Sequence, residues 1–153
     1  MITLREIGNY EMFDECVGLQ IKEGQKLYSN AYSLAEAWLN CKIKEVGLIP
    51  FCIYNDDTMV GFVMLIYDED EKELGIYRFM IDEKYQGMGY GKEAMKAVLE
   101  YIYNNPFFNN YSIGLDVHPN NEIAIKLYRS VGFVASGIDD ETGELEMELK
   151  RTE

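Results

Sequence analysis

The sequence predicts an α/β (α+β) fold with a mixed sheet, in which hairpins flank a strand–helix–strand–helix unit. Several short segments alternate apolar and polar residues, which is typical of strands. Two other segments repeat apolar residues at helical spacing, one of them directly after a glycine-rich run. The chain has 153 residues and no repeat or linker, so we expect one domain spanning residues 1–153.

The first half of the chain predicts a strand, two helices and a hairpin. We expect the second helix to begin at Ser33, because Ser33 and Glu36 have the spacing of a capping box. The turn of the hairpin is indicated by the polar run NDDT between two apolar runs. The expected elements are a strand at 2–6, helices at 10–17 and 33–44, and strands at 51–54 and 59–67 around a turn at 55–58.

The second half predicts a strand, a helix, a second strand and helix, and a closing hairpin. Asn105-Pro106 ends the first of these helices, and Gly132 is suited to cap the second. The acidic run at 68–73 is most simply a solvated hairpin tip. The expected elements are a strand at 75–82, a helix from about 91 to 104, a strand at 111–117, a helix at 121–131, and a hairpin from 133 with a turn at 139–143 and a strand at 145–149.

The charge balance narrows the classes of partner. The chain has 27 acidic and 14 basic residues, for a formal net charge of −13. Nucleic acid and anionic membranes would be repelled, so we expect neither as a partner. A cationic substrate is compatible with this charge, and so is a simple role of the acidic residues in solubility.

The cysteines and the apolar runs suggest a location. Cys16, Cys41 and Cys52 lack metal-ligand spacing, which predicts no metal site and buried thiols in a reducing compartment. The N-terminus shows no signal peptide, and the longest apolar stretch, residues 61–67, is too short to span a bilayer. We therefore expect a cytoplasmic protein.

The run KYQGMGYGK at 84–92 allows three interpretations. A mononucleotide phosphate loop is excluded, because Gln86 and Glu93 stand where glycine and a hydroxyl residue are needed. A dinucleotide loop is disfavoured, because its strand would run almost directly into Gly89, whereas seven residues, DEKYQGM, separate Gly89 from Ile81. The third interpretation is a helix N-terminus whose free amides bind a pyrophosphate.

Two segments carry a family resemblance. RFMIDEKYQGMGYGKEAM (78–95) resembles the acyl-CoA loop of the GNAT superfamily of N-acetyltransferases, with Gln86, Gly89 and Gly91 at the motif positions. Residues 117–133 resemble the strand end and helix that follow in that family. The matching positions there are Asn121, Ala124, Leu127, Tyr128, Gly132 and Phe133.

The resemblance covers roughly residues 47–149, and it implies a mostly antiparallel central sheet with a splayed parallel pair, flanked by helices. Together with the run SLAEA (33–37), the 78–87 segment is similar to bacterial spermine/spermidine acetyltransferases.

The resemblance implies acetyl-CoA as cosubstrate, no metal, and roles for individual residues. Tyr128 would protonate the departing thiolate. Independently of the resemblance, His118 is a candidate base because it ends a strand beside the loop, with an ordinary loop residue as the alternative. A water chain leading to carboxylates could also carry the proton without one strong base. The implied cofactor-binding residues are Met80, Ile81, Gln86, Gly87, Met88, Gly89, Tyr90, Gly91, Lys92 and Asn121.

The implied activity is transfer of acetyl to a primary amine such as spermidine or spermine, by direct attack in a ternary complex. Candidates for binding spaced ammonium groups are Glu23, Tyr28, Tyr32 and Glu36, through charge pairing and cation–π contact. Other acceptors stay open, namely a protein N-terminus or lysine, an aminoglycoside or an amino acid. So does a non-catalytic acyl-CoA sensor. The resemblance also leaves a homodimer open.

Overall fold

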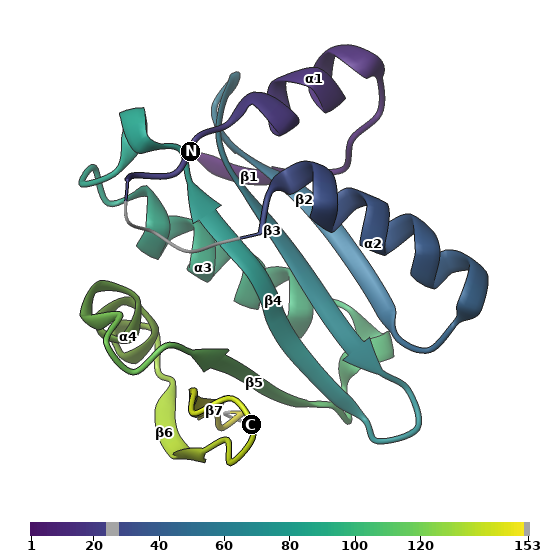
Figure 1. The fold of residues 1–153 in the computed structure, drawn as a ribbon, viewed down its shortest axis with the longest axis vertical. Helices are drawn as coiled ribbons and strands as arrows, with labels where there is room; N and C mark the ends of the chain where they lie inside the picture. The colour runs from purple at the N-terminus through teal and green to yellow at the C-terminus, as the bar shows by residue number, and fades with distance from the viewer. Residues whose placement is uncertain (24–27, 152–153) are drawn as a thin grey trace.

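The computed structural model describes residues 1–23 and 28–151. Within them, one seven-stranded sheet has the order β1-β2-β3-β4-β5-β7-β6 (Figure 1). All neighbouring strands are antiparallel except β4 and β5, which confirms the predicted mixed fold. The strands are β1 (Ile2–Arg5), β2 (Gly47–Asn55), β3 (Thr58–Asp68), β4 (Glu73–Ile81), β5 (Ser112–Val117), β6 (Val134–Ile138) and β7 (Leu145–Leu149).

Four α-helices cover the two faces of this sheet. In Figure 1, α1 and α2 lie in front of the central strands and α3 lies behind them. Short 3-10 turns at Glu83–Tyr85 and Pro106–Phe108 precede and follow α3. The helices are α1 (Tyr10–Gly18), α2 (Asn30–Ile43), α3 (Tyr90–Tyr103) and α4 (Glu122–Ser130).

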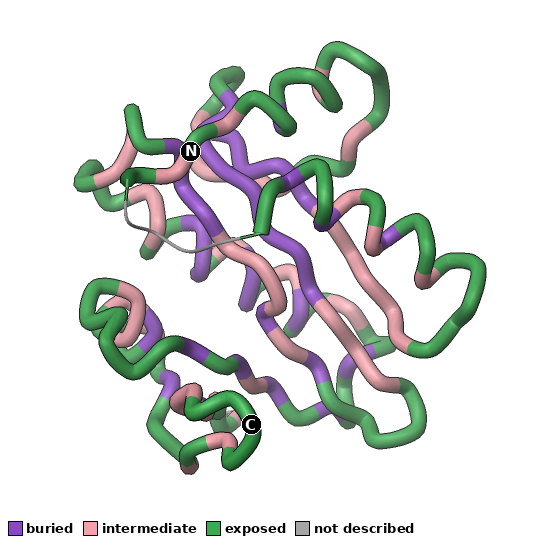
Figure 2. Tube along the Cα trace, in the orientation of Figure 1, coloured by how far each residue is buried: buried purple, intermediate pink, exposed green. Residues whose placement is uncertain are grey.

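Each face of the sheet has its own hydrophobic core. Side chains of α3 and α4 pack in one cluster with Val63 and Leu65 of β3, while α1 and α2 pack in a second cluster with Phe62 and Met64. All four of these β3 side chains are fully buried, and the centre of β3 is purple in Figure 2. Burial of each such side chain contributes roughly 1.5–3 kcal/mol, so β3 anchors both layers.

The start of α2 differs from the prediction. The N-cap is Ser29, whose Oγ accepts from the Tyr32 amide at 3.1 Å. The amide of Ser33 already donates to the Ser29 carbonyl, so the helix has begun before Ser33. Ser33 is buried against the sheet, and its hydroxyl has no hydrogen-bond partner among the described residues. The predicted Ser33–Glu36 capping box is therefore wrong, because a better-placed serine caps the helix one turn earlier.

Strand β2 is longer than the predicted 51–54 and includes Pro50. Proline cannot donate to a strand ladder and is tolerated where a strand edge is free. Strand β1 pairs only with residues 52–55 of β2, so Pro50 lies where that edge has no partner strand.

Candidate functional site

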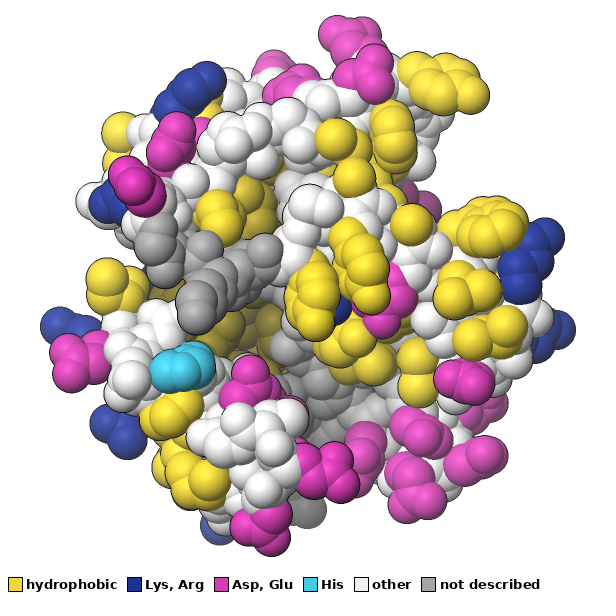
Figure 3. Space-filling view, in the orientation of Figure 1, with side chains coloured by type: hydrophobic (Ala, Val, Ile, Leu, Met, Phe, Trp, Pro, Cys, Tyr) yellow, Lys and Arg dark blue, Asp and Glu magenta, His cyan; other side chains and the backbone are white. Residues whose placement is uncertain are grey.

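Strands β4 and β5 pair at one end and then separate. Their register covers only Glu73–Gly75 and Ser112–Gly114. Beyond these residues, no pairing between the two strands is found in the described part of the chain. Figure 3 shows the molecule hollowed on this face, between the α2 side and the C-terminal strands. The splayed pair implied by the sequence is present.

A bulge in β4 lies where the two strands part. In β3, Met64 lies opposite Arg78. The next residue, Leu65, lies opposite Ile76, so Tyr77 is an extra residue in β4. Bulges bend a strand and change the direction of its side chains. Sequence alone did not reveal this bulge, because the extra residue, Tyr77, is an ordinary strand-forming residue.

The glycine run forms the turn between β4 and α3. Gly87 and Gly89 have φ values of 80° and 83°, a region in which side chains are strained. Gly89 is the N-cap of α3 and provides no side-chain cap. The first intrahelical bond is from Glu93 N to Gly89 O, so the amides of residues 89–92 have no intrahelical partner. Uncapped amides at a helix N-terminus suit a phosphate group, which agrees with the third interpretation of this run.

Two side-chain contacts hold this turn in place. Gln86 Nε2 donates to the carbonyl of Ile81 at 2.8 Å, which ties the turn back to the end of β4. Asn55 Nδ2 donates to the hydroxyl of Tyr90 at 3.0 Å, which ties the first residue of α3 to the end of β2. Met88, by contrast, is 60% exposed, and Lys92 is also exposed.

A buried carboxylate joins the turn to the chain after α1. Asp82 is only 4% exposed and follows β4 directly. Its Oδ2 accepts from the Gln20 amide at 2.9 Å, and its Oδ1 accepts from the Lys84 amide at 3.0 Å. The Glu83 amide donates back to the Gln20 carbonyl at 2.8 Å. We refer to these contacts of Gln20 with Asp82 and Glu83 as the Gln20 clasp. In the sequence, the available signal was an aspartate directly after a strand, and the predicted site did not include it.

Helix α4 presents the other predicted cofactor and catalytic residues. Asn121 is its N-cap, and Asn121 Oδ1 accepts from the Ala124 amide at 3.2 Å. Tyr128 is 8% exposed and lies in the α3/α4 core, with its ring edge-on to Phe133 at 5.9 Å. Burial raises the pKa of Tyr128 to about 12. The phenol is therefore protonated throughout the physiological range.

Three of the four predicted acceptor residues lie around one guanidinium group. Tyr28 and Tyr32 stack with ring centroids 4.9 Å apart. The guanidinium of Arg78 lies over the ring of Tyr28 at 4.3 Å and over that of Tyr77 at 3.9 Å. The carboxylate of Glu36 accepts from Tyr77 and Arg78, so it is already engaged within the protein.

The remaining sequence candidates are not joined to this group. Glu23 is exposed, and no contact among the described residues links it to the tyrosines. His118 is exposed, and its Nδ1 accepts from the amide of Asn120 in the loop before α4. The position of His118 therefore agrees with the interpretation that it is an ordinary loop residue.

The three cysteines fall into two environments. Cys16 and Cys52 are buried, as predicted, but Cys41 is exposed on α2, where the prediction is wrong because that face of the helix is open to solvent. A hydrogen bond with Cys52, followed by burial, raises the pKa of the Cys16 thiol far above its ordinary value. The Cys16 thiol is therefore a poor nucleophile, and the Cys52 side chain is fully buried.

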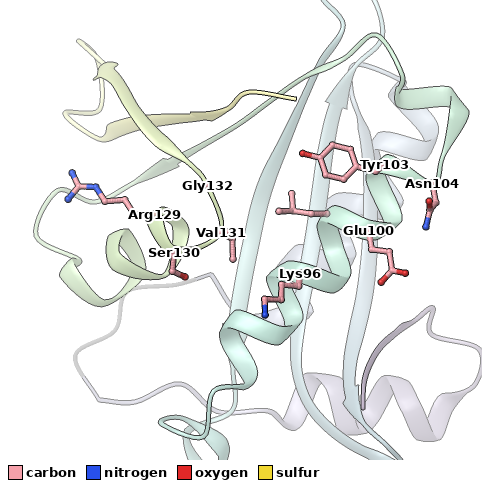
Figure 4. Close-up of a pocket in the computed structure, with 9 residues that line it drawn as sticks. Lys96, Glu100, Tyr103, Asn104, Arg129, Ser130, Val131 and Gly132 are labelled. Carbon is pink, nitrogen blue, oxygen red and sulfur yellow. The ribbon is translucent and has the colours of Figure 1, made fainter. Parts of the chain in front are cut away.

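A second hollow lies away from the glycine turn. It has a volume of about 780 Å³ and lies between α3 and the end of α4, where Lys96, Tyr103 and Gly132 contribute to its lining (Figure 4). The side chain of Arg129 extends away from α3, and Lys96 is paired with Glu93 at 3.2 Å. Polar groups do not converge there, so we do not assign it to catalysis.

The described residues hold neither a cluster suited to a metal ion nor a helix suited to a membrane. No cluster of three or more potential metal-binding side chains was found in residues 1–23 and 28–151. Over the same ranges, none of the helices has the length and apolar character needed to cross a membrane.

Comparison with known sequences identifies relatives over much of the chain. The spermine/spermidine N(1)-acetyltransferase of Bacillus subtilis is 38% identical over 101 residues, which is 62% of this chain and 65% of that protein. The spermidine N(1)-acetyltransferase of Escherichia coli K12 is 30% identical over 87 residues, which is 57% of this chain and 46% of that protein. The matches therefore span less than two thirds of the length of these relatives.

Solved structures share the fold at low sequence identity. The PaiA N-acetyltransferase of Thermoplasma acidophilum in complex with coenzyme A has a TM-score of 0.68 and 18% identity, with 99% of each chain covered. The aminoglycoside acetyltransferase AAC(6')-Ib in complex with coenzyme A has a TM-score of 0.73 and 18% identity, with 99% of this chain and 95% of the other covered. The sequence profile of the acetyltransferase (GNAT) family matches residues 14–133. The chain belongs to the acetyltransferase (GNAT) family.

Proposed function

We propose that this protein transfers the acetyl group of acetyl-CoA to a primary amine, and that the amine is a small polycation such as spermidine or spermine. The observation that carries the proposal is the uncapped N-terminus of α3 behind Gly87 and Gly89, next to the separating strands β4 and β5. Two sequence relatives are named for polyamines, which supports the choice of acceptor. A net charge of −13 favours a cationic partner.

The cofactor side of the site is built mainly from backbone. The amides of residues 87–92 bind the pyrophosphate, and the main chain of Met80 and Ile81 lies beside the pantetheine arm as an added strand would. Gln86 supports this turn through Ile81, and Asn121 adds a contact from the start of α4. The exposed Met88 and Lys92 flank the phosphates, and Tyr90 is held by Asn55.

The reaction is a direct transfer. Acetyl-CoA supplies an activated thioester. The amine must first lose a proton, which costs about 4–5 kcal/mol at pH 7 for a pKa near 10.4. Its nitrogen then forms a bond to the carbonyl carbon, the carbon–sulfur bond breaks, and Tyr128 donates its phenolic proton to the thiolate. The nitrogen releases its remaining extra proton to water, and Tyr128 recovers a proton from water, which yields the neutral amide and the free thiol. The buried thiols of Cys16 and Cys52 cannot act as acyl carriers, which favours direct attack over a covalent route.

The acceptor lies on the α2 side of the opening. The Tyr28 ring is covered by Tyr32 on one face and by Arg78 at 4.3 Å on the other, so Tyr28 supports the ring of Tyr32. Tyr32 is 53% exposed, and a substrate ammonium can reach its outer face. Glu23 adds an exposed carboxylate from the chain that leaves α1. These three residues form the proposed acceptor surface.

The experiment is a thiol-release assay with acetyl-CoA against polyamines, lysine peptides, aminoglycosides and amino acids, paired with calorimetric titration of acetyl-CoA. We expect micromolar-range binding and the highest kcat/KM with spermidine or spermine. Preference for a monoamine or an amino acid would overturn the acceptor assignment alone. Binding without turnover across the panel would favour an acyl-CoA sensor, and absence of binding would overturn the proposal as a whole.

A further inference from the structure

The bulge of β4 places two consecutive side chains on the same face of the sheet. Tyr77 packs with the α1/α2 core, and Arg78 reaches α2 as well. In a regular strand, neighbouring side chains point to opposite faces. The bulge is therefore the reason that both side chains meet α2.

One carboxylate of α2 binds both of these side chains. Glu36 Oε2 accepts from the Tyr77 hydroxyl at 2.7 Å, and Glu36 Oε1 accepts from Arg78 Nη2 at 3.2 Å. The side chains of Arg78 and Glu36 are only 11% and 22% exposed. Arg78 Nη1 also donates to the Tyr77 carbonyl at 3.1 Å, so the Arg78 side chain binds the backbone of the bulge as well. A charged pair that is shielded from water and supported by further hydrogen bonds holds its geometry more firmly than a surface pair.

The bulge lies where β4 separates from β5, directly before the residues proposed to contact acetyl-CoA. Pairing of β4 with β5 ends at Gly75, and Met80 and Ile81 follow the bulge on the separated part of the strand. The direction of this backbone thus depends on how the bulge is held. Because Arg78 balances the charge of Glu36, that carboxylate is not available as a free counter-ion for a substrate ammonium.

We propose that Glu36 is a positioning residue, which fixes the β4 bulge through Tyr77 and Arg78 and thereby aligns residues 78–81 along the opening between β4 and β5. This inference rests on the proposed acetyl transfer and replaces direct ammonium binding as the role of Glu36.

The first test measures the bulge itself in the free protein and does not need turnover. In Glu36→Gln, hydrogen exchange of the amides of residues 76–81 becomes roughly tenfold faster, because a local contact equivalent to about 1.4 kcal/mol is lost. In the control Asp57→Asn, which removes a fully exposed carboxylate 3.8 Å from Arg5, exchange at 76–81 is unchanged. Parent-like exchange in Glu36→Gln would overturn the proposal.

The second test separates positioning from substrate binding. If Glu36 holds the bulge in place, Glu36→Gln lowers kcat by the same factor, roughly tenfold, for spermidine and for a simple monoamine. KM for spermidine then stays within about twofold of the parent value. If Glu36 binds an ammonium instead, KM for spermidine rises alone and the monoamine is unaffected, which overturns the inference.

A milder variant covers the case in which Glu36→Gln does not fold. Tyr77→Phe removes only the hydroxyl that Glu36 accepts from, and it lowers kcat for both amines in the same proportion. Unequal effects on the two amines would contradict positioning. If the parent acetylates no amine, the proposed function fails, while the exchange experiment still decides whether Glu36 pins the bulge.

Discussion

The side-chain amide of Asn55, the last residue of β2, donates a hydrogen bond of 3.0 Å to the hydroxyl of Tyr90, the first residue of α3. The bond joins the end of β2 to the helix end that carries the free amides. It holds that helix end in place without using any of the free amides.

Asn55→Ala should therefore weaken acetyl-CoA binding more than it affects chemistry. Loss of one partly buried hydrogen bond corresponds to about 0.5–1.5 kcal/mol, so we expect KM for acetyl-CoA to rise roughly threefold to tenfold, with kcat nearly unchanged. Tyr90→Phe removes the same bond from the other side. Steady-state kinetics of both variants and the double variant should show effects that do not add. Additive effects would mean that the two residues act separately.

Tyr128→Phe should abolish most turnover and leave cofactor affinity intact. Removing a general acid lowers kcat by roughly 10²–10⁴, whereas the ring remains packed on Phe133. The measurements are thiol release and calorimetric titration of CoA. A variant that retains near-parental kcat would show that the phenol is a packing residue alone.

The buried phenol of Tyr128 should lower the stability of the protein at alkaline pH. Its pKa is raised by burial to about 12, so above pH 10 the unfolded chain ionises this phenol while the folded chain does not. The free energy of unfolding therefore falls by up to about 1.4 kcal/mol per pH unit between roughly pH 10 and 12. Tyr128→Phe lacks this loss. Urea denaturation at pH 9, 10 and 11 should show the stability of the variant declining less steeply, and parallel declines would contradict the assignment.

Gly87→Ala and Gly89→Ala should reduce CoA affinity through backbone strain. An added Cβ at either position meets no atom within 4 Å, so the cost comes from the positive φ and is about 1–2 kcal/mol each. Gly143 provides a matched control, since it has φ 74° and equally open surroundings in the β6–β7 turn. Gly143→Ala should lose similar thermal stability while binding CoA like the parent. Equal loss of CoA affinity in all three variants would refute a local role for the turn.

Asp116→Asn should stabilise the protein at neutral pH. Asp116 lies opposite Glu146 on β7 and is exposed, and its pKa is raised first by partial desolvation and then by the charge of Asp139. Because the unfolded chain releases this proton at lower pH, stability falls as pH rises through the window above the ordinary carboxyl value. We expect a gain of about 0.5 kcal/mol at pH 7, since the site is partly solvated. In thermal scans the gain should vanish near pH 3, and a gain that persists there would point to another cause.

Much of the fold was predictable because local patterns and tertiary packing agree. The alternation in LEMEL and the helical repeat after Gly91 each survive in the structure as β7 and α3. The start of α2 was not predictable in the same way. Ser29 and Ser33 are both acceptable caps, and only the packing of Ser33 against the sheet decides between them.

The candidate site likewise has one part that the sequence predicts and one part that it does not. The glycine turn follows from chain geometry, so sequence spacing located it. The arrangement around Arg78 depends on a bulge and on a contact between residues far apart in the chain. Periodicity carries no information about such a contact, and Glu36 was therefore predicted as a substrate ligand.

The two separate cores have a consequence for how this architecture can diversify. Since α1 and α2 pack in one cluster and α3 and α4 in another, substitutions in the first pair can reshape the acceptor surface without disturbing the packing behind the cofactor turn. The Gln20 clasp is a fixed point between the two halves, because backbone atoms of Gln20 bond to Asp82 and Glu83 whatever side chain residue 20 carries. Exchange of the α1–α2 segment between relatives that keep Glu36 is therefore expected to alter the preferred amine while the acetyl donor stays the same.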